Sequence, residues 1–165
     1  MPHLDPAGLE LLDTASNVLS TDVDIAGDID LVWSVIADNE SWSEWFEKCA
    51  WVRSDEPRWS AVGQTRTIKS TPFVIDETCI AFDAPHRWGI ELNRSNLPMA
   101  KRMIEVLELT DTSRNGEDRT EVRWTAAFEP LPYLRPFVGV QAQILIRTWG
   151  RSLEALHGAV ASRQR

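Results

Sequence analysis

The segment from Pro136 to the C-terminus constrains the fold most strongly, because it predicts one long amphipathic helix. Pro136 suits the first helical turn, where its missing N–H is not needed. Apolar residues recur at steps of three and four, which places them on one stripe: Val138, Ala142, Leu145, Trp149, Leu153, Leu156 and Val160. Several arginines lie toward the negative end of the helix dipole: Arg147, Arg151, Arg163 and Arg165. A stripe of this length needs a broad surface to cover it.

Segments of alternating polarity before this helix predict an antiparallel sheet. The first strand is expected over residues 18–26. Five more strands, separated by turn-forming residues, are expected at 65–70, 73–83, 87–94, 101–111 and 120–129. Asp28 is expected to cap one short helix after the first strand, and the SWSEWFEKC segment to form a second. The prediction is an α+β fold in which a curved antiparallel sheet of about six or seven strands wraps round the C-terminal helix.

Length and charge limit the classes of protein to consider. The 165 residues fit one domain, with residues 1–17 as an N-terminal extension that begins a short helix after Asp5. The net charge of −8 disfavours nucleic-acid and anionic-membrane partners, since both would be repelled. The chain has no apolar run that could cross a bilayer and no signal-peptide pattern. We therefore expect a cytoplasmic protein without stable membrane insertion.

The metal-ligating residue types are scattered. Cys49 and Cys79 are isolated, and the three histidines lie far apart in the sequence. We expect reduced thiols, no metal site and no cofactor.

The order of elements resembles the helix-grip fold of the START-like (SRPBCC) superfamily. The stretch VDIAGDIDLVWSVIADNESWSEWF is similar to the opening of that family, and VGQTRTI, FDAPHRWGIEL and TEVRWTAAFEP are similar to its later strands. The resemblance covers the chain from about residue 18. Within the superfamily it is nearest to the polyketide cyclase/dehydrase and lipid-transport type. It implies a hydrophobic ligand in a cavity between the sheet and the last helix, but it identifies no catalytic residue.

Strand pairing predicts which side chains face that helix. With Pro72 at a hairpin tip, Ile68 faces Ile75 and Arg66 faces Glu77. With the next tip at Pro85-His86, the expected pairs are Cys79 with Leu92, Ala81 with Ile90, and Glu77 with Arg94. The two registers place the same apolar set on one side: Ile68, Phe73, Ile75, Cys79, Ala81, Trp88, Ile90 and Leu92. In the last two strands the matching set is Met103, Leu107, Leu109, Val122, Trp124, Ala126 and Phe128.

Four charged residues share this apolar face: Arg66, Glu77, Arg94 and Glu105. Buried unpaired charge costs several kcal/mol per ion. One hypothesis is therefore an Arg66–Glu77–Arg94 cluster lining a pocket, with Glu105 nearby. The alternative is a set of solvated cross-strand pairs at the sheet margin. Further candidates for ligand contact are Trp124, Trp149 and Tyr133, although the tryptophans also suit a core and the tyrosine a surface.

Three functions remain open from the sequence. The first is binding of a small hydrophobic molecule of the lipid, polyketide or isoprenoid type. The second is a cyclase or dehydrase in which Glu77 or Glu105 acts as general acid/base while Arg66 or Arg94 stabilises an oxyanion. The third is a ligand-free interaction module that uses the acidic surface or the N-terminal extension. A homodimer is compatible with each of them.

Overall fold

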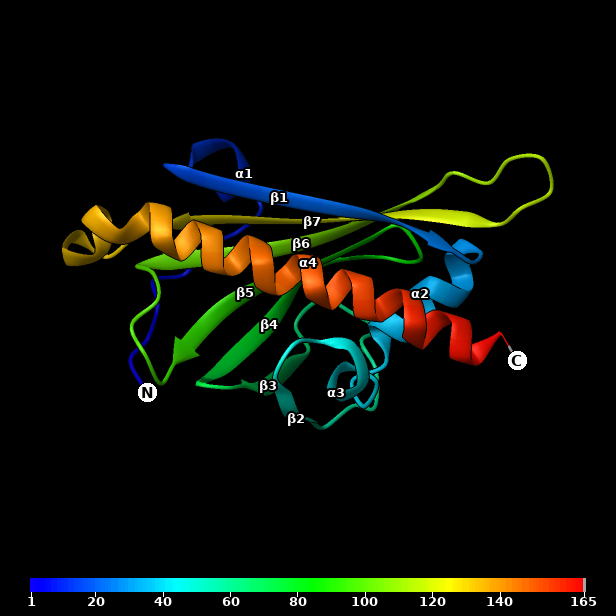
Figure 1. The fold of residues 1–165 in the computed structure, drawn as a ribbon. Helices are drawn as coiled ribbons and strands as arrows, with labels where there is room; N and C mark the ends of the chain where they lie inside the picture. Colours follow the sequence, from blue (N-terminus) through cyan, green and yellow to red (C-terminus); the bar gives the residue numbers. More distant parts are fainter. Residues whose placement is uncertain (165) are drawn as a thin grey trace.

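The computed structural model describes residues 1–164, so the expected contribution of Arg165 to the helix end lies outside the described residues. Seven antiparallel strands form one sheet in the order β1-β7-β6-β5-β4-β3-β2. Their bounds are β1 (Asn17–Ala26), β2 (Cys49–Ser54), β3 (Thr65–Ser70), β4 (Phe73–Asp83), β5 (Arg87–Ser95), β6 (Arg102–Asp111) and β7 (Arg119–Glu129). The long helix α4 (Val138–Arg163) lies across one face of the sheet (Figure 1). The predicted helix-grip α+β architecture is confirmed.

The helices begin where local chemistry allows. The Asp28 carboxylate accepts a hydrogen bond from the Leu31 N–H at 2.9 Å and so caps α2 (Ile29–Ala37) as expected. The short helix α3 (Trp42–Trp45) follows. The start expected for α4 is wrong, since Pro136 lies in a 3-10 helix, η1 (Pro132–Phe137). The Val138 N–H bonds to the Arg135 carbonyl, which is the i to i−3 pattern of a 3-10 turn, and regular α-helix starts only there.

The N-terminal segment is extended where a helix was expected. The backbone N–H of Leu4 bonds to the Asn93 carbonyl at 2.8 Å, and that of Asp5 bonds to the Lys101 carbonyl at 2.7 Å. The segment thus bridges the end of β5 and the start of β6, where these two strands diverge. These bonds hold residues 4 and 5 in an extended conformation, and the first helix begins only at Leu11.

Helix α1 (Leu11–Thr14) is therefore short and lies later in the chain. Its Leu11 side chain is fully buried against Ile104 and Ala127. These two residues alternate along β6 and β7 with residues that face α4, so α1 covers the opposite face of the sheet.

The predicted register is right for one hairpin and wrong for the next. Arg66 pairs with Glu77 and Ile68 with Ile75, as expected. Across β4 and β5 the observed pairs are instead Cys79 with Ile90, Ala81 with Gly89, Glu77 with Leu92 and Asp76 with Arg94. Two bulges in this pair of strands cause the difference, and the one after Leu92 reverses the alternation of side chains. Arg94 consequently points to the face away from α4.

The edge strand β2 was missed in the sequence, where residues 47–64 read as the end of a helix and a loop. Its pairing with β3 is interrupted by a bulge between Cys49 and Trp51, so the polarity does not alternate regularly. The strand lengthens the sheet beside α3. No described helix has the length and hydropathy needed to span a membrane.

Candidate functional site

A cavity of about 120 Å³ lies between the sheet, α3 and the middle of α4. Most of its wall is apolar, but three ionisable side chains gather at one end. Its lining includes Trp42, Phe46, Arg66, Ile68, Phe73, Ile75, Glu77, Met99, Glu105, Trp124, Leu145 and Trp149. Five of the residues proposed from the sequence therefore meet in one place: Arg66, Glu77, Glu105, Trp124 and Trp149.

Arg66 and Glu77 form a buried ion pair at this polar end. The Arg66 Nε donates to Glu77 Oε2 at 2.7 Å, and the Arg66 side chain has no exposed surface. Burial raises the pKa of Glu77, while the guanidinium of Arg66 opposes that rise. The cross-strand pairing of β3 and β4 brings the two residues opposite each other, which is why the sequence alone could place them together.

Tryptophan rings enclose the Arg66 guanidinium. Its central carbon lies 3.9 Å from the ring centroid of Trp42, 5.0 Å from that of Trp59 and 5.1 Å from that of Trp88. Such contacts stabilise a cation that has lost its water. The Nη2 group of Arg66 is buried and has no hydrogen-bond partner among the described residues. A buried donor of this kind is costly unless something binds it, and because the Arg66 side chain has no accessible surface, an acceptor oxygen reaches Nη2 only when the surrounding rings move.

Asn39 also holds Arg66, and sequence reasoning missed it. Its Oδ1 accepts from Arg66 Nη1 at 3.2 Å, while its Nδ2 donates to the Glu56 carbonyl at 3.0 Å. Asn39 lies just after α2, 27 residues from Arg66 in the chain. No pattern in the sequence joins these segments, and the contact arises only when α2 packs on the sheet.

Glu105 is the third ionisable group of the cavity. Its Oε2 accepts a hydrogen bond from Trp124 Nε1 at 2.9 Å, and the residue is buried. Burial, reinforced by the negative charge of Glu77, raises the pKa of Glu105 to about 8. At neutral pH this carboxyl is therefore mostly protonated and can donate a hydrogen bond.

Aromatic rings form the wall beside these groups. The rings of Trp124 and Trp149 lie 5.5 Å apart at 14° to each other. Phe46 and Trp42 lie against Trp124, with centroid distances of 5.6 and 6.0 Å. The result is a flat aromatic surface next to a hydrogen-bonding end.

Two proposed residues do not reach the cavity. Arg94 pairs with Asp76 at 2.7 Å on the outer face, in an open groove of about 500 Å³, so its predicted cluster with Glu77 is wrong. Tyr133 lies in η1 with 62% of its surface exposed. It lines a different depression together with residues of the N-terminal segment such as Leu4.

A second hollow, of about 270 Å³, adjoins the cavity on the side of η1. The two share four lining residues, which form the boundary between them: Phe73, Met99, Ile144 and Leu145. Gln141 Nε2 donates to the Met99 carbonyl at 2.8 Å and so ties the loop of residues 96–101 to α4. The inner cavity accommodates a group of about benzene size, and a larger ligand would extend into the outer hollow past Met99.

The net charge and the protonation states of these side chains determine which ligands the inner cavity can bind. The Arg66–Glu77 pair is neutral as a unit, and Glu105 is mostly neutral below pH 8. The polar end thus offers hydrogen-bond donors to an oxygen atom without net charge, while Lys48, also in the lining of the cavity, carries a positive charge. Burial raises the pKa of the nearby Cys79 to about 11, which leaves its thiol protonated and a poor nucleophile.

Comparison with known proteins supports one family. The family model described as "Polyketide cyclase / dehydrase and lipid transport" matches residues 17–163. Among solved structures, the Zhui aromatase/cyclase from Streptomyces sp. R1128 is similar, with a TM-score of 0.70 and 16% identity over 90% of this chain and 96% of that one. The protein XoxI from Bacillus cereus gives a TM-score of 0.71 and 15% identity, covering 90% of this chain and 98% of its own.

A START superfamily protein from Mycobacterium smegmatis gives a TM-score of 0.66 and 16% identity, covering 88% of this chain and 97% of that one. At these identities the likeness concerns the fold. None of the curated proteins matches the sequence. The family match begins at residue 17, so the N-terminal segment that bridges β5 and β6 lies outside the matched region.

Proposed function

This chain belongs to the polyketide cyclase/dehydrase and lipid-transport family, and we propose from this premise that it binds a small hydrophobic molecule carrying a neutral oxygen. The ligand is of the lipid, polyketide or isoprenoid type. Its ketone, phenol or alcohol oxygen reaches Arg66 and Glu105, while its apolar body lies on the Trp124–Trp149 wall. The observation that carries the proposal is the presence of two buried hydrogen-bonding side chains, Arg66 and Glu105, in the lining of a mostly apolar cavity.

Charge balance supports a neutral ligand over an acid. Arg66 already has Glu77 as its counter-ion at 2.7 Å, so a ligand carboxylate at the polar end would add a negative charge that this pair does not compensate, although Lys48 also lines the cavity. Burying such a charge costs several kcal/mol. A neutral oxygen avoids this cost and satisfies the free donor, which is worth about 0.5–1.5 kcal/mol.

Three aromatic probes of similar size test the proposal by calorimetry: naphthalene, 1-naphthol and 1-naphthoate. We expect 1-naphthol to bind about fivefold more tightly than naphthalene, since one hydrogen bond contributes about 1 kcal/mol. We expect 1-naphthoate to bind most weakly. Tighter binding of the carboxylate than of the alcohol would contradict the proposal.

The double variant Arg66→Met with Glu77→Met removes the polar end without leaving a buried charge unpaired. It should bind naphthalene as before and lose the preference for 1-naphthol. The matched control is Arg94→Met with Asp76→Met, an ion pair of the same 2.7 Å length on the outer face, which should retain the preference.

The two carboxyl groups favour a second candidate, an enzyme that enolises a bound ketone. Glu105, largely protonated at neutral pH, would give its proton to the carbonyl oxygen, while ionised Glu77 would take a proton from the adjacent carbon. The net product is the enol, with Glu105 left ionised and Glu77 left protonated, and the reverse step restores both carboxyl groups. Cyclisation and dehydration both proceed through such an intermediate.

Proton exchange of 2-tetralone in D₂O, followed by NMR, tests this candidate without a known substrate. The native protein should accelerate exchange at the carbon next to the carbonyl. Glu105→Gln keeps the acceptor for Trp124 but has no acidic proton, and it should reduce the acceleration by about 10²–10⁴. A native protein that binds the ketone but does not accelerate exchange would leave binding alone as the function.

A further inference from the structure

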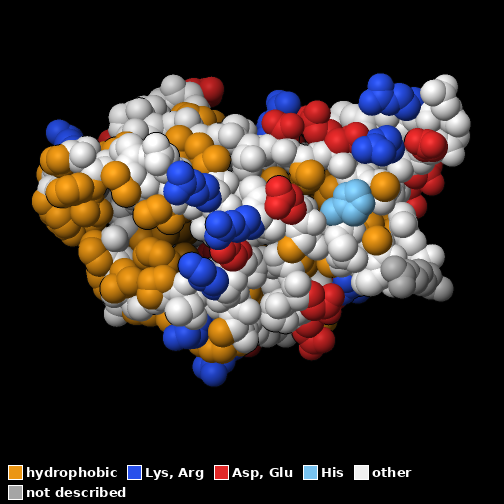
Figure 2. Space-filling view, viewed as in Figure 1, with side chains coloured by type: hydrophobic (Ala, Val, Ile, Leu, Met, Phe, Trp, Pro, Cys, Tyr) orange, Lys and Arg blue, Asp and Glu red, His pale blue; other side chains and the backbone are white. Residues whose placement is uncertain are grey.

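The start of α4 exposes apolar side chains around the outer hollow. Phe137 and Val140 are each 62% exposed, and Ile144 is 56% exposed. Their spacing of three and four places them on one stripe. Figure 2 shows the apolar side chains gathered at this end of the molecule, on the left of the view. Isolated exposed apolar residues are ordinary, but a continuous group marks an interaction site.

Neighbouring segments extend this stripe. Leu97, in the loop between β5 and β6, is 37% exposed, and Tyr133 in η1 is 62% exposed. The hollow of about 270 Å³ opens among Phe137, Val140 and Pro98. We name the surface of Leu97, Tyr133, Phe137, Val140 and Ile144 the helix-start face.

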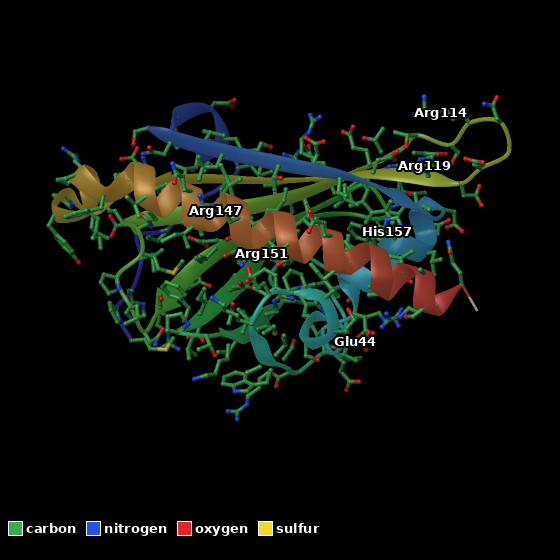
Figure 3. The ribbon with its side chains drawn as sticks, in the orientation of Figure 1. Glu44, Arg114, Arg119, Arg147, Arg151 and His157 are labelled. Carbon is green, nitrogen blue, oxygen red and sulfur yellow. The ribbon has the colours of Figure 1, made fainter. Side chains whose placement is uncertain are left out.

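The chain segments that form the helix-start face contain basic residues and no acidic ones. Residues 130–153 contain no aspartate or glutamate but three arginines, Arg135, Arg147 and Arg151. The adjoining segments 68–75 and 95–101 likewise contain lysine and no acid. Figure 3 places Arg147 and Arg151 along the exposed side of α4.

Only part of this positive charge is neutralised by the protein. Arg151 pairs with Glu47 at 3.0 Å, and Lys101 lies 3.6 Å from Asp5. Arg135 and Arg147 make no ion pair with any described residue. The net charge of −8 is therefore carried elsewhere on the molecule. Charges separated by more than a Debye length, about 8 Å at physiological salt, are largely screened from each other.

We propose that the helix-start face docks on the surface of an anionic lipid bilayer. Phe137, Val140 and Ile144 insert among the headgroups, and the neighbouring arginines contact lipid phosphates. The acids that line the depression beside Leu97 and Tyr133, Asp5 and Glu129, pair with Lys101 and Arg102, so the unpaired arginines leave this face basic. An apolar stripe beside an excess of basic charge is the pattern of helices that lie in a membrane interface. The outer hollow then faces the lipid.

Charge argues against a second copy of this chain as the occupant. A two-fold contact through the helix-start face would bring the unpaired Arg135 and Arg147 of two protomers close to each other. Like charges held together in this way weaken an interface. A bilayer supplies the opposite charge together with an apolar layer of the required depth.

Co-sedimentation with vesicles of phosphatidylcholine containing about 30% phosphatidylglycerol tests the proposal. The native protein should bind these vesicles and bind pure phosphatidylcholine more weakly, and added salt should reduce the difference. Val140→Asp should weaken binding at least about tenfold, because it places a charge in the apolar stripe. The matched control is Val62→Asp, since Val62 is 60% exposed on a loop outside the helix-start face. That variant should bind like the native protein.

Arg147→Gln gives an independent measurement that leaves the apolar stripe intact. It should weaken binding to the anionic vesicles about fivefold, which corresponds to about 1 kcal/mol per basic residue at the surface. Absence of native binding to the anionic vesicles would overturn the proposal. So would an equal loss in Val62→Asp, or a vesicle-free dimer that Val140→Asp dissociates. Naphthalene binding to Arg147→Gln reports the cavity separately, because Arg147 lines neither hollow, so failure of docking is distinguishable from failure of the ligand proposal.

Discussion

The two halves of α4 have the same amphipathic sequence pattern but different surroundings. In the C-terminal half, Trp149, Leu153, Leu156 and Val160 are almost completely buried under the sheet, α2 and α3. In the N-terminal half, Val138 and Leu145 of the same stripe are only partly buried. The Glu47 N–H bonds to Ser152 Oγ at 2.9 Å and fixes the C-terminal half to the rest of the protein. The N-terminal half borders two hollows instead.

This difference separates stability from ligand access along one helix. A well-packed half can hold the helix in place while the other half leaves space beside it. The stripe in the sequence is therefore an indication of which face turns inward, and it carries no information on how tightly that face is covered.

The largest effect that would test this comparison is on stability. Leu156→Ala, at a fully buried position, should lower the free energy of unfolding by about 2–5 kcal/mol. Leu145→Ala removes the same atoms from a side chain that already borders a cavity, and it should cost at least about 1.5 kcal/mol less. Urea unfolding followed by tryptophan fluorescence measures both. Equal losses would mean that the two halves are packed alike.

A second test asks whether the loosely packed half still keeps water from the cavity. The pKa of Glu105 rises from an ordinary 4.5 to about 8 because the residue is buried in the folded protein. Between these values the folded state holds a proton that the unfolded state has released. The stabilising contribution of that proton is complete below about pH 4.5 and is lost as the pH rises through about 8.

Native stability should therefore fall with pH relative to Glu105→Gln, by about 1.4 kcal/mol per pH unit in this window. Urea unfolding at pH 5.5, 6.5 and 7.5 measures the slope. Glu108→Gln, at an exposed position on the same strand, is the control and should keep the native slope. A native slope equal to that of Glu105→Gln would show that water reaches the carboxyl.

The cavity residues differ in how far the sequence could predict them. Arg66 and Glu77 follow from a tight turn at Pro72, because the register of a hairpin close to its turn is fixed locally. Arg94 does not, since a bulge inserts one residue between it and Leu92 and changes the face to which it points. A bulge without glycine leaves no clear mark in the sequence.

Other features depend on contacts that no local pattern contains. Asn39 meets Arg66 only through the packing of α2, and Gln141 meets Met99 only because the loop of residues 96–101 lies against α4. The size of the cavity depends on how the tryptophan rings pack against one another. The overall fold was predictable because strand order, turns and the helix stripe all agree with one architecture.

The smallest predicted effect concerns the tie between the loosely packed half of α4 and the loop of residues 96–101. Gln141→Leu keeps the shape of the side chain but removes the hydrogen bond to the Met99 carbonyl, so stability should fall by only about 1 kcal/mol. The main consequence of this substitution is a change in the mobility of the loop of residues 96–101. Met99 lines both hollows, so loosening this loop should let ligand pass more readily between them.

Hydrogen exchange and stopped-flow binding can separate these two consequences. Amide exchange in residues 97–101 should increase in Gln141→Leu, while exchange in residues 150–160 should stay at the native rate. The association rate of 1-naphthol should rise as well. Gln143→Leu is the matched control, because Gln143 is an exposed glutamine in the same turn region of α4 that makes no hydrogen bond from its side chain to a described residue. Faster exchange along the whole helix would mean that Gln141 holds both halves of α4, and the distinction between them would fail.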